Sequence, residues 1–513
     1  MSSLAELVAA AGAVAADSSR LAKVRALAKG IRGLAPDEIA TGVEYLSGEL
    51  PQGRIGIGPA VVQAARAMPP ASAPSLSVRE VDRRLEELAS MRGSGAPERR
   101  AVALRELFAH ATAPEQDVLA RLLLGELRQG ALTGVMVDAV AHESAVPVAG
   151  IRRAAMYSQS LGTVASAALR GGAAELEQFQ LEVLHPVAPM LAQTAADTTE
   201  ALARFSGDVA FEWKVDGARI QVHKAAATVR IYTRNLNDVT AALPEIAELA
   251  RTLTADELVL DGEAIALTAA GRPHPFQVTM RRFGRKLDIE TLRSELPMQA
   301  FFFDCLRLDG RSLADRPSRE RFNALARAVP DSLQIPRLIT SSPEAAQEFY
   351  EQALAAGHEG VMAKALDAPY AAGNRGASWL KIKRVHTLDL VILAAEGGHG
   401  RRTGLLSNLH LGALDTATGD YVMLGKTFKG LTDAMLRMQT ERLLELETRR
   451  DRYTVYVRPE QVVEIAFSDL QARPRYPGGI AVRLARVKRY RDDKTAAEAD
   501  TMETVRRIYD SLR

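Results

Sequence analysis

Residues 213–219 read Trp213-Lys214-Val215-Asp216-Gly217-Ala218-Arg219, and they follow an apolar run at 209–211 that predicts a β-strand. A lysine at the end of such a strand is partly desolvated. Burial disfavours its ammonium form, so we expect the pKa of Lys214 to lie below its usual value of about 10.4. A neutral amine can attack an electrophilic phosphorus. Asp216 and Gly217 predict a turn, after which Arg219 places a planar cation over the same site. Taken alone, the stretch also fits a strand, a turn and a surface salt bridge.

Two other segments place a carboxylate beside an apolar strand. Glu263 closes the run Leu260-Asp261-Gly262-Glu263, and Glu359 belongs to the run Glu359-Gly360-Val361-Met362-Ala363-Lys364. Two carboxylates that converge on a phosphate site are the ligands that Mg²⁺ takes from a protein while it keeps some of its waters. Each Asp-Gly or Glu-Gly pair, read alone, also fits a hairpin turn.

The segment Trp379-Leu380-Lys381-Ile382-Lys383 alternates between apolar and basic residues. In a strand this alternation puts Lys381 and Lys383 on one face and packs Leu380 and Ile382 behind it. Two cations on one face suit a phosphate group, although a solvated strand face has the same pattern.

These segments lie in the middle one of three blocks of different texture. From about 208 to 384, β-rich runs alternate with helical runs, which predicts an α+β domain with antiparallel strands. The first block is rich in Ala and Leu with helical periodicity, so we expect an all-α domain. The last block is strand-rich with one helix at about 432–447, which suits a small β-barrel of the OB type. We therefore predict domains at 1–184, 185–385 and 386–513.

The chain has 513 residues, of which 47% are hydrophobic and 25% charged, and its formal net charge is +2. Bulk charge therefore indicates no polyanionic partner, and any nucleic-acid surface must be built locally. A single cysteine, Cys305, excludes an intrachain disulfide and a Cys-rich zinc site. The chain has no apolar run of membrane-spanning length and no signal-peptide pattern, so we expect a cytoplasmic protein without membrane contact.

Taken in order, the segments resemble those of ATP-dependent DNA ligases, which are covalent nucleotidyltransferases. The matching residues are Lys214-x-Asp216-Gly217-x-Arg219, Asp261-Gly262-Glu263, Phe303-Asp304, Glu359-Gly360-Val361-Met362 and Lys381-x-Lys383. The stretch 471–494, with eight basic and two acidic residues, resembles the carboxy-terminal Arg-rich motif of the family. Upstream, Pro189-Met190-Leu191-Ala192 resembles the entry to the nucleotidyltransferase domain, and Leu127-Arg128-Gln129-Gly130-Ala131 resembles part of the amino-terminal DNA-binding domain of the larger ligases. The resemblance spans almost the whole chain.

The resemblance implies a helical DNA-binding domain, an α+β adenylation domain and an OB-fold that close around nicked duplex DNA. Lys214 would attack the α-phosphorus of ATP and carry AMP as lysyl-AMP. AMP would then move to a 5′-phosphate, and a neighbouring 3′-hydroxyl would displace it to seal the strand. The barrel would have to swing between these steps. The resemblance further implies Mg²⁺ or Mn²⁺ as the metal and a monomeric enzyme of DNA replication, repair or recombination. The absence of Cys-rich fingers, repeat tails and targeting peptides favours a compact bacterial or archaeal enzyme.

The resemblance also implies roles for single residues. Around the base and the metal ion, the implied residues are Glu212 as the reader of adenine, Phe303 and Met362 as a sandwich for the ring, Glu263 at the ribose or metal, and Glu359 at the metal. Around the phosphates, they are Arg219, Lys381 and Lys383 on phosphate oxygens, Arg234 near the nucleotide and the 5′-phosphate of the nick, and Arg491, Asp493 and Lys494 on the pyrophosphate leaving group. Phosphoryl transfer depends mainly on such positioning and charge neutralisation.

Contacts with DNA are expected at two places. Residues 280–286 carry four cations in seven residues, which favours contact with DNA phosphates over a merely solvated loop. The cations are Arg281, Arg282, Arg285 and Lys286. Arg128, in the upstream segment, is the other expected contact.

Several alternatives share part of this pattern. An mRNA capping guanylyltransferase or an ATP-dependent RNA ligase can carry Lys-x-Asp-Gly-x-Arg, but neither is expected to bring a long helical domain ahead of it. An NAD-dependent ligase is disfavoured because one cysteine cannot build its usual zinc finger. A catalytically dead DNA-end binder would have no chemical need for Lys214, Glu263, Glu359 and Lys381 together.

Overall fold

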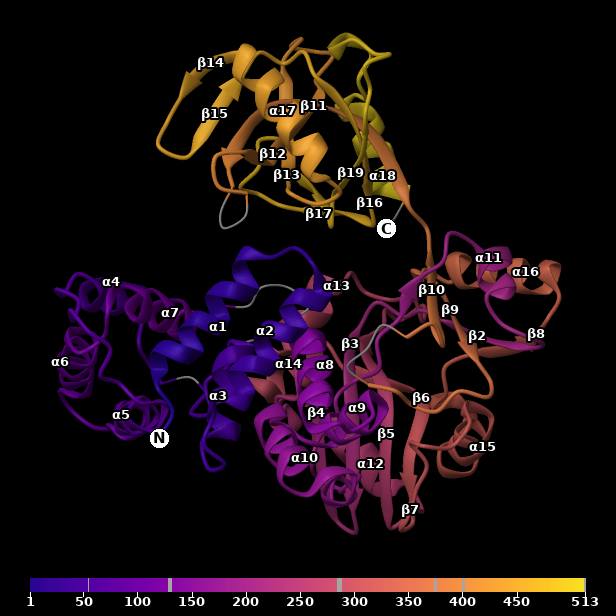
Figure 1. Cartoon of the computed structure of the whole chain (residues 1–513). Coiled ribbons are helices and arrows are strands. Elements are labelled where there is room, and N and C mark those ends of the chain that lie inside the picture. The colour runs from indigo at the N-terminus through magenta and orange to yellow at the C-terminus, as the bar shows by residue number, and fades with distance from the viewer. Residues whose placement is uncertain (54, 128–131, 284–287, 373–375, 399–401, 512–513) are drawn as a thin grey trace.

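The structure, a computed structural model, describes residues 1–53, 55–127, 132–283, 288–372, 376–398 and 402–511. Its elements form three groups that follow each other along the chain (Figure 1). The first, helical group lies beside the middle group. The third group lies across from both and joins the middle group through the connection from β10 to β11.

The first group is helical, as predicted. Among the described residues, ten helices form between Leu4 and Leu176: α1 (Leu4–Ala16), α2 (Arg20–Arg32), α3 (Ile39–Ser47), α4 (Pro59–Arg66), α5 (Val78–Ser90), α6 (Ala96–Ala109), α7 (Ala113–Leu123), α8 (Leu132–Ser144), α9 (Val148–Tyr157) and α10 (Leu161–Leu176). Most of their buried apolar side chains form one hydrophobic cluster. In α5, for example, Val78, Val81, Leu85 and Leu88 recur on one buried face, and Ser77 caps the helix by accepting a hydrogen bond from Glu80 N. In the described part of the chain, no helix has both the length and the hydropathy that a membrane crossing requires.

The middle group contains two five-stranded sheets. One has the order β4-β3-β5-β6-β7 and the other β1-β10-β9-β2-β8. The first sheet comprises β3 (Ala218–Ala225), β4 (Thr228–Thr233), β5 (Glu257–Ala266), β6 (Met298–Leu308) and β7 (Arg311–Ser312), and the second comprises β1 (Gln193–Thr194), β2 (Val209–Trp213), β8 (Arg337–Thr340), β9 (Gly360–Ala365) and β10 (Trp379–Lys383). All pairings are antiparallel except β1 with β10, so the predicted antiparallel α+β class is confirmed.

Helices cover the outer faces of both sheets. The helices of this group are α11 (Thr198–Ala203), α12 (Pro244–Thr252), α13 (Phe276–Thr279), α14 (Ile289–Glu295), α15 (Ser318–Ala328) and α16 (Pro343–Ala355). Helices α12 and α15 pack on the first sheet, and α11 and α16 pack on the second. Each sheet therefore has its own hydrophobic cluster on the face that its helices cover. The two faces that the sheets turn toward each other can carry a functional site.

The third group is strand-rich, as predicted. It comprises β11 (His386–Gly397), β12 (Leu406–Leu414), β13 (Tyr421–Thr427), α17 (Asp433–Glu445), β14 (Glu447–Arg450), β15 (Thr454–Val457), β16 (Val462–Phe467), β17 (Asp469–Ala472), β18 (Ile480–Arg483), β19 (Arg486–Tyr490) and α18 (Met502–Ser511). The long strand β11 pairs with β12, β15 and β16. Among the described strands, β13 pairs only with β12 and β19 only with β16, so these pairings do not establish a closed barrel.

The segment that joins the helical group to the first sheet is fastened to β3. Leu184 N donates to His223 Nδ1 at 3.2 Å, and Gln221 exchanges two hydrogen bonds with the backbone of Val187 at 3.0 and 2.6 Å. His223 is fully buried, and this burial lowers its pKa to about 3. The neutral ring is required because its Nδ1 must accept the Leu184 hydrogen bond.

Acid is therefore expected to destabilise the folded protein through His223. The unfolded histidine binds a proton near pH 6.5 whereas the folded one stays neutral down to a pKa of about 3. The stabilisation is complete above pH 6.5 and is lost as the pH falls, by at most about 1.4 kcal/mol per pH unit. Urea unfolding at pH 7, 6 and 5 measures this slope. His223→Gln, which keeps a hydrogen-bonding side chain that does not titrate, should have a shallower slope, and equal slopes would contradict the assignment.

Candidate active site

Lys214 is positioned by two backbone hydrogen bonds. Lys214 N donates to Gly360 O at 2.8 Å, and Glu359 N donates to Lys214 O at 3.1 Å. The end of β2 is thus tied to the start of β9, which places Lys214 beside Glu359. Gly360 has φ +142°, and a Cβ there would lie 2.2 Å from Ile382 O, so only glycine fits. This is the physical reason for the Glu-Gly pair seen in the sequence.

Lys214 is ion-paired, which corrects the expectation about its pKa. Its Nζ lies 2.5 Å from Glu359 Oε2, and Lys383 Nζ lies 3.0 Å from Glu359 Oε1. Burial pushes the pKa of Lys214 down, but Glu359, helped by the charges of Glu263 and Asp216, outweighs it, so the pKa is raised. The pKa of Glu359 is lowered, because Lys214 and Lys383 together outweigh its burial. The sequence pattern predicted the burial of Lys214 but not that Glu359 would face it.

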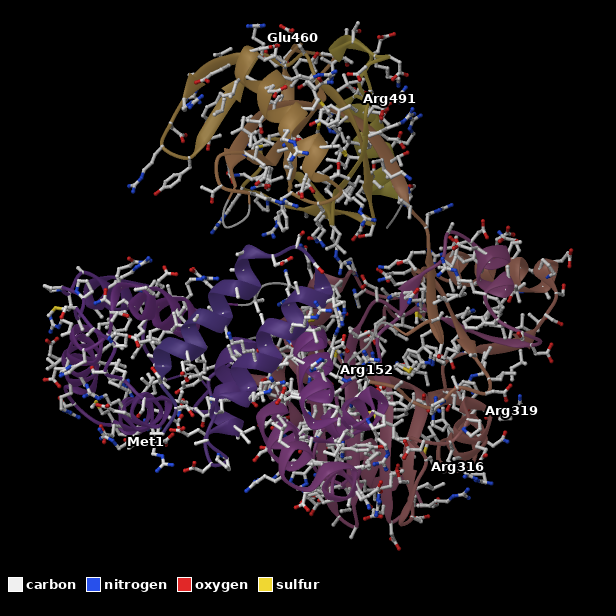
Figure 2. All side chains as sticks on the ribbon, in the orientation of Figure 1. Met1, Arg152, Arg316, Arg319, Glu460 and Arg491 are labelled. Carbon is white, nitrogen blue, oxygen red and sulfur yellow. The ribbon has the colours of Figure 1, made fainter. Side chains whose placement is uncertain are left out.

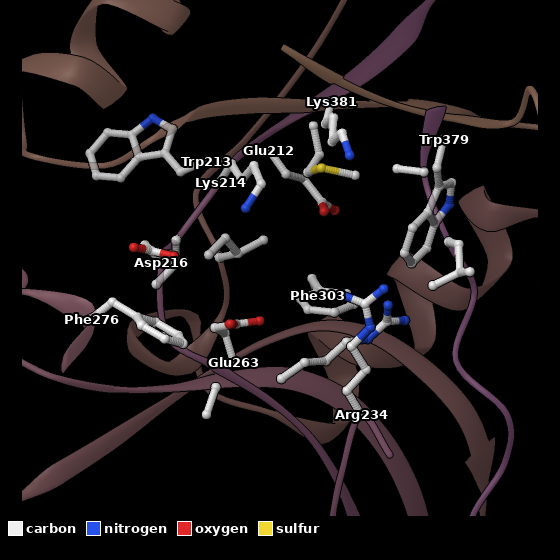
Figure 3. A pocket seen from close by; sticks show the side chains of 18 of the residues that line it. Glu212, Trp213, Lys214, Asp216, Arg234, Glu263, Phe276, Phe303, Trp379 and Lys381 are labelled. Carbon is white, nitrogen blue, oxygen red and sulfur yellow. The ribbon is translucent and has the colours of Figure 1, made fainter. Parts of the chain in front are cut away.

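Glu263 lies on β5 directly opposite Arg219 on β3. Burial raises the pKa of Glu263 to about 8, although Lys214 and Arg219 act in the other direction. Among the described residues no side chain donates a hydrogen bond to it or pairs with it. Figure 3 shows the carboxylate of Glu263 and the amine of Lys214 directed into the same space. Glu263 is only partly exposed, and a partly buried carboxylate without a partner is a costly arrangement that a bound cation would relieve.

The residues present fit a magnesium ion of the kind that substrate phosphates share. No cluster of three or more His, Cys, Asp or Glu side chains suited to a metal exists among the described residues. Mg²⁺ is usually held by one or two carboxylates, with waters and phosphate oxygens as its other ligands. Glu263 and Glu359, which both lie beside Lys214, meet this requirement.

Arg219 is held in place by a buried network. Its guanidinium pairs with Asp261 at 2.7 Å and donates to Met190 O at 2.6 Å. Tyr370 OH accepts from Arg219 at 3.1 Å and donates to Asp261 at 2.7 Å. The guanidinium carbon also lies 5.6 Å from the ring centres of Phe303 and of Trp379. Arg219 therefore lines the site as a fixed cation, most of whose donors are already used.

Glu212 lies at the inner end of the site and is almost fully buried. It pairs with Arg337 at 2.7 Å and with Lys364. The Lys364 ammonium in turn lies 4.5 Å from the ring centre of Phe303 and 4.2 Å from that of Trp379. Two basic side chains thus hold the Glu212 carboxyl group beside an aromatic wall.

These side chains enclose a cavity of about 770 Å³ between the two sheets. Strands β2, β9 and β10 supply Glu212, Met362 and Lys381, while β3, β5 and β6 supply Arg219, Glu263 and Phe303. Arg234, which follows β4, is exposed at the rim of the cavity (Figure 3). The cavity thus combines an aromatic ring wall, cations suited to phosphates and a lysine amine. This combination suits a nucleotide whose phosphate faces the lysine.

The third group also reaches the cavity. Arg483 NH1, at the end of β18, pairs with Asp216 Oδ2 at 2.7 Å, and its guanidinium lies 4.4 Å from the ring centre of Phe276. Leu484 lines the cavity as well. The three residues expected at the pyrophosphate are not there. Arg491 lies on the third group (Figure 2) and is ion-paired with Asp493, while Arg491 and Lys494 share Asp389. None of the three is among the residues that line the cavity.

Three family descriptions match successive parts of the chain. "DNA ligase N terminus" matches residues 59–141, "ATP dependent DNA ligase domain" 189–383 and "ATP dependent DNA ligase C terminal region" 402–494. A "Probable DNA ligase" of Anaeromyxobacter sp. (strain Fw109-5) is 59% identical over 99% of this chain and 98% of its own length. The chain belongs to the ATP-dependent DNA ligase family. A "Probable DNA ligase" of Mycolicibacterium gilvum (strain PYR-GCK) is 54% identical over 99% of both chains.

A solved structure described as "Pmar-Lig_Pre." shares the fold of this ligase. It aligns with a TM-score of 0.63 over 95% of this chain and 99% of its own, at 18% identity. The protein is thus a multi-domain ATP-dependent DNA ligase, and sealing of nicks in DNA is its expected function. The predicted family, enzyme class and reaction are confirmed.

The expected DNA contacts of this ligase have different outcomes. Arg282 is completely buried, pairs with Glu245 at 2.6 Å and donates to the carbonyl groups of Leu296 and Ala242. The expectation that Arg282 binds DNA phosphate is therefore wrong, because the buried side chain links the start of helix α12 to the segment that precedes strand β6. Arg281 is exposed, as a DNA contact must be. Arg128, Arg285 and Lys286 lie outside the described residues.

Sequence reasoning missed four residues that this ligase brings to its site. Tyr370 and Arg337 lie in segments with no motif around them, so no signal pointed to them. Lys364 ends the quoted Glu359 segment and Trp379 begins the quoted lysine strand, and both were assigned no role. The alternation of β9 and β10 could have placed Lys364 and Trp379 at the cavity wall, since they pair directly across the two strands.

Proposed function

We propose that the cavity between the two sheets binds ATP and that Lys214 carries AMP to the 5′-phosphate of nicked duplex DNA. The adenine would lie between Phe303 and Met362, with Glu212 accepting from its amino group. Arg337 and Lys364 hold the Glu212 carboxyl group in place, and its oxygens as acceptors favour the amino group of adenine over the carbonyl oxygen of guanine. Arg219, Arg234, Lys381 and Lys383 would contact phosphate oxygens.

In the first step Lys214 Nζ forms a bond to the α-phosphorus, the bond from that phosphorus to the bridging oxygen breaks, and pyrophosphate leaves. Lys214 must first lose a proton, and Glu359 opposes this loss as long as it faces the amine. If Glu359 is engaged by a cation, the burial that remains lowers the pKa of Lys214 and releases the neutral nucleophile. Mg²⁺ bound by Glu263 and Glu359 would neutralise phosphate charge.

The next two steps use the same cavity. AMP passes from Lys214 to the 5′-phosphate, and the 3′-hydroxyl then displaces AMP to form the phosphodiester. Arg491, Asp493 and Lys494 would act on the pyrophosphate in the first step, which requires the C-terminal group to turn. Arg483 instead holds a different part of that group over the cavity through Asp216. This arrangement suits the later steps, in which a DNA-facing surface is needed instead.

We infer three domains with boundaries near 184/185 and 385/386, since separate hydrophobic clusters fill the first and third groups. The C-terminal domain is proposed as an OB-type barrel, with the hairpin β17–β18 packing against β13. Exposed Arg281 would contact DNA phosphate. We propose a monomer that acts on the chromosome in the bacterial cytoplasm, with Mg²⁺ or Mn²⁺ as its metal.

The observation that carries the proposal is Lys214 at the wall of a cavity shared with Glu212, Glu263 and Lys381. The experiment is the joining of a labelled duplex with one 3′-hydroxyl/5′-phosphate nick, with ATP, GTP or NAD as the nucleotide. Joining with ATP alone is expected. Joining with GTP alone would favour capping-type chemistry, and joining confined to RNA ends would favour an RNA ligase. A nick without the 5′-phosphate is the matched control.

Removing residues 1–184 should spare self-adenylation but sharply weaken nick binding and sealing. The cavity is built entirely from later residues, whereas the helical domain would add phosphate contacts on the duplex. Nick sealing at physiological salt and labelling by ATP are compared for the full and shortened chains, with thermal melting as the control for folding. Unchanged sealing by the shortened chain would refute this role.

A further inference from the structure

Asp389 binds two of the cations that the proposed first step needs. Its Oδ2 accepts from Arg491 NH1 at 2.6 Å and from Lys494 Nζ at 2.6 Å. Arg491 is held on its other edge by Asp493, which accepts from Nε at 2.8 Å and from NH2 at 2.7 Å. The residues expected at the pyrophosphate therefore form one connected unit, and Asp389 is the member that sequence reasoning did not find.

The backbone of Asp389 is fixed as well. Asp389 N donates to Asp500 Oδ2 at 2.7 Å, and Asp500 N donates to Asp389 O at 2.8 Å. Asp389 lies in β11, the strand that follows directly from the pocket strand β10, and it pairs across the sheet with Glu464 of β16. All members of the unit belong to the C-terminal domain, so a rotation of that domain moves them together.

Stability alone does not explain this carboxylate. Asp389 is 7% exposed, and among the described residues its second oxygen, Oδ1, is buried and accepts no hydrogen bond. A buried acceptor without a donor costs free energy. Asp389 is retained despite this cost, and it orders two long basic side chains. We take this as evidence that Asp389 positions those side chains.

The cations keep donors for another anion. Arg491 has five N–H donors and uses three of them here, and Lys494 uses one of three. The Lys494 side chain is 32% exposed and that of Arg491 is 14% exposed. Carboxylates thus hold both cations from one side and leave the remaining N–H donors for phosphate oxygens. In metal sites, residues that hydrogen-bond to the ligands orient them in the same way.

We propose that Asp389 is a positioning residue for nucleotide loading. It acts through Arg491 and Lys494, which it holds in fixed orientations so that both meet the departing pyrophosphate when the C-terminal domain turns toward the cavity. The inference rests on the proposed function, because it assumes that these two cations serve the first step. It adds that one buried carboxylate of β11 fixes the orientation of the two cations, and that this orientation matters as well as their charge.

The test separates the steps of the reaction in the full-length enzyme. Asp389→Asn should slow labelling of the protein by α-labelled ATP by about 10- to 100-fold, the usual effect of losing an orienting partner. It should seal a nick that already carries a 5′-adenylate at close to the wild-type rate, since that step needs no pyrophosphate contact. The reverse reaction, release of ATP from the adenylated enzyme by inorganic pyrophosphate, should require more pyrophosphate.

The matched control is Glu464→Gln, which removes the facing carboxylate that pairs with Arg489 at 2.7 Å. Labelling and sealing by this variant should stay near wild type. Asp389→Glu keeps the charge but moves the oxygens, so it should fold and still label slowly. In an Arg491→Ala, Lys494→Met background Asp389→Asn should add no further loss, because the residue acts through these two side chains.

Wild-type labelling by Asp389→Asn would overturn the inference. An equal loss in labelling and in sealing of the adenylated nick would overturn it too, because it would indicate a purely structural role. Failure of the proposed function would look different, since the wild-type enzyme itself would then not be labelled by ATP.

Discussion

Lys214→Ala is expected to abolish labelling of the protein by α-labelled ATP, with a loss of about 10⁴-fold or more, the scale seen when a covalent nucleophile is removed. Lys214→Arg should be equally inactive, because a guanidinium does not give up its proton in proteins. Phosphoramidate label that survives denaturation is the measurement. Exposed Lys29 on α2 supplies the control Lys29→Ala, which should label normally.

The same variant distinguishes loss of the nucleophile from loss of the fold. Lys214→Ala should still seal a nick whose 5′-phosphate already carries AMP, because the third step uses the cavity but not the amine. Label on Lys214→Ala would mean that another residue is the nucleophile. Failure to seal the adenylated nick, with normal thermal melting, would mean that Lys214 has a second role.

Glu263→Gln is expected to reduce labelling by about 10²- to 10³-fold, comparable to removing one electrostatic group from a transition state. The reason is that Glu263, as proposed, would face the metal, and it has no protein partner among the described residues. Its pKa of about 8 means that the carboxyl is largely neutral at pH 6.5 and ionised at pH 9. Because the ionised form binds the metal, the Mg²⁺ concentration needed for half-maximal labelling should fall as the pH rises and level off above pH 8.

The variant should lose this pH dependence. The stability of the metal-free protein gives the second readout, since a carboxyl whose pKa is raised stabilises the fold below its unfolded value of 4.5 and loses that contribution as the pH rises to about 8. Mg²⁺ should therefore raise the melting temperature of the wild type more at pH 9 than at pH 6.5. An Mg²⁺ effect that is the same at both pH values in the wild type and in Glu263→Gln would contradict the metal assignment.

Much of the fold follows from local patterns. The predicted helix at about 432–447 is α17, and the alternating segment 379–383 is strand β10. The convergence of Lys214 and Lys381 on one cavity was also predictable, because Lys214 follows an apolar strand and Lys381 alternates with apolar residues along another. Glu263 reaches the same cavity, although it lies within β5 and not at the end of a strand as expected. The family resemblance rests on the order of these residues along the chain, and the antiparallel strand pairings bring their side chains close together.

What the sequence could not predict depends on contacts distant along the chain. The pKa of Lys214 depends on Glu359, which only the tie between β2 and β9 brings to 2.5 Å. In the sequence nothing distinguishes Arg282 from its exposed neighbour Arg281, but the Arg282 guanidinium is buried in an ion pair with Glu245. The orientation of the C-terminal domain depends on contacts such as Asp216 with Arg483 and Gln277 with Gln471, and no local periodicity encodes such contacts.

The most direct test of the central claim is a pulse and chase in a single turnover. The enzyme is labelled with α-labelled ATP and Mg²⁺, freed of nucleotide and mixed with nicked duplex DNA. The account predicts that label leaves Lys214, passes briefly through the 5′ end of the nick and ends as free AMP, with one sealed nick for each labelled protein. Label that stays on the protein, or that is released as AMP without a sealed strand, would contradict it.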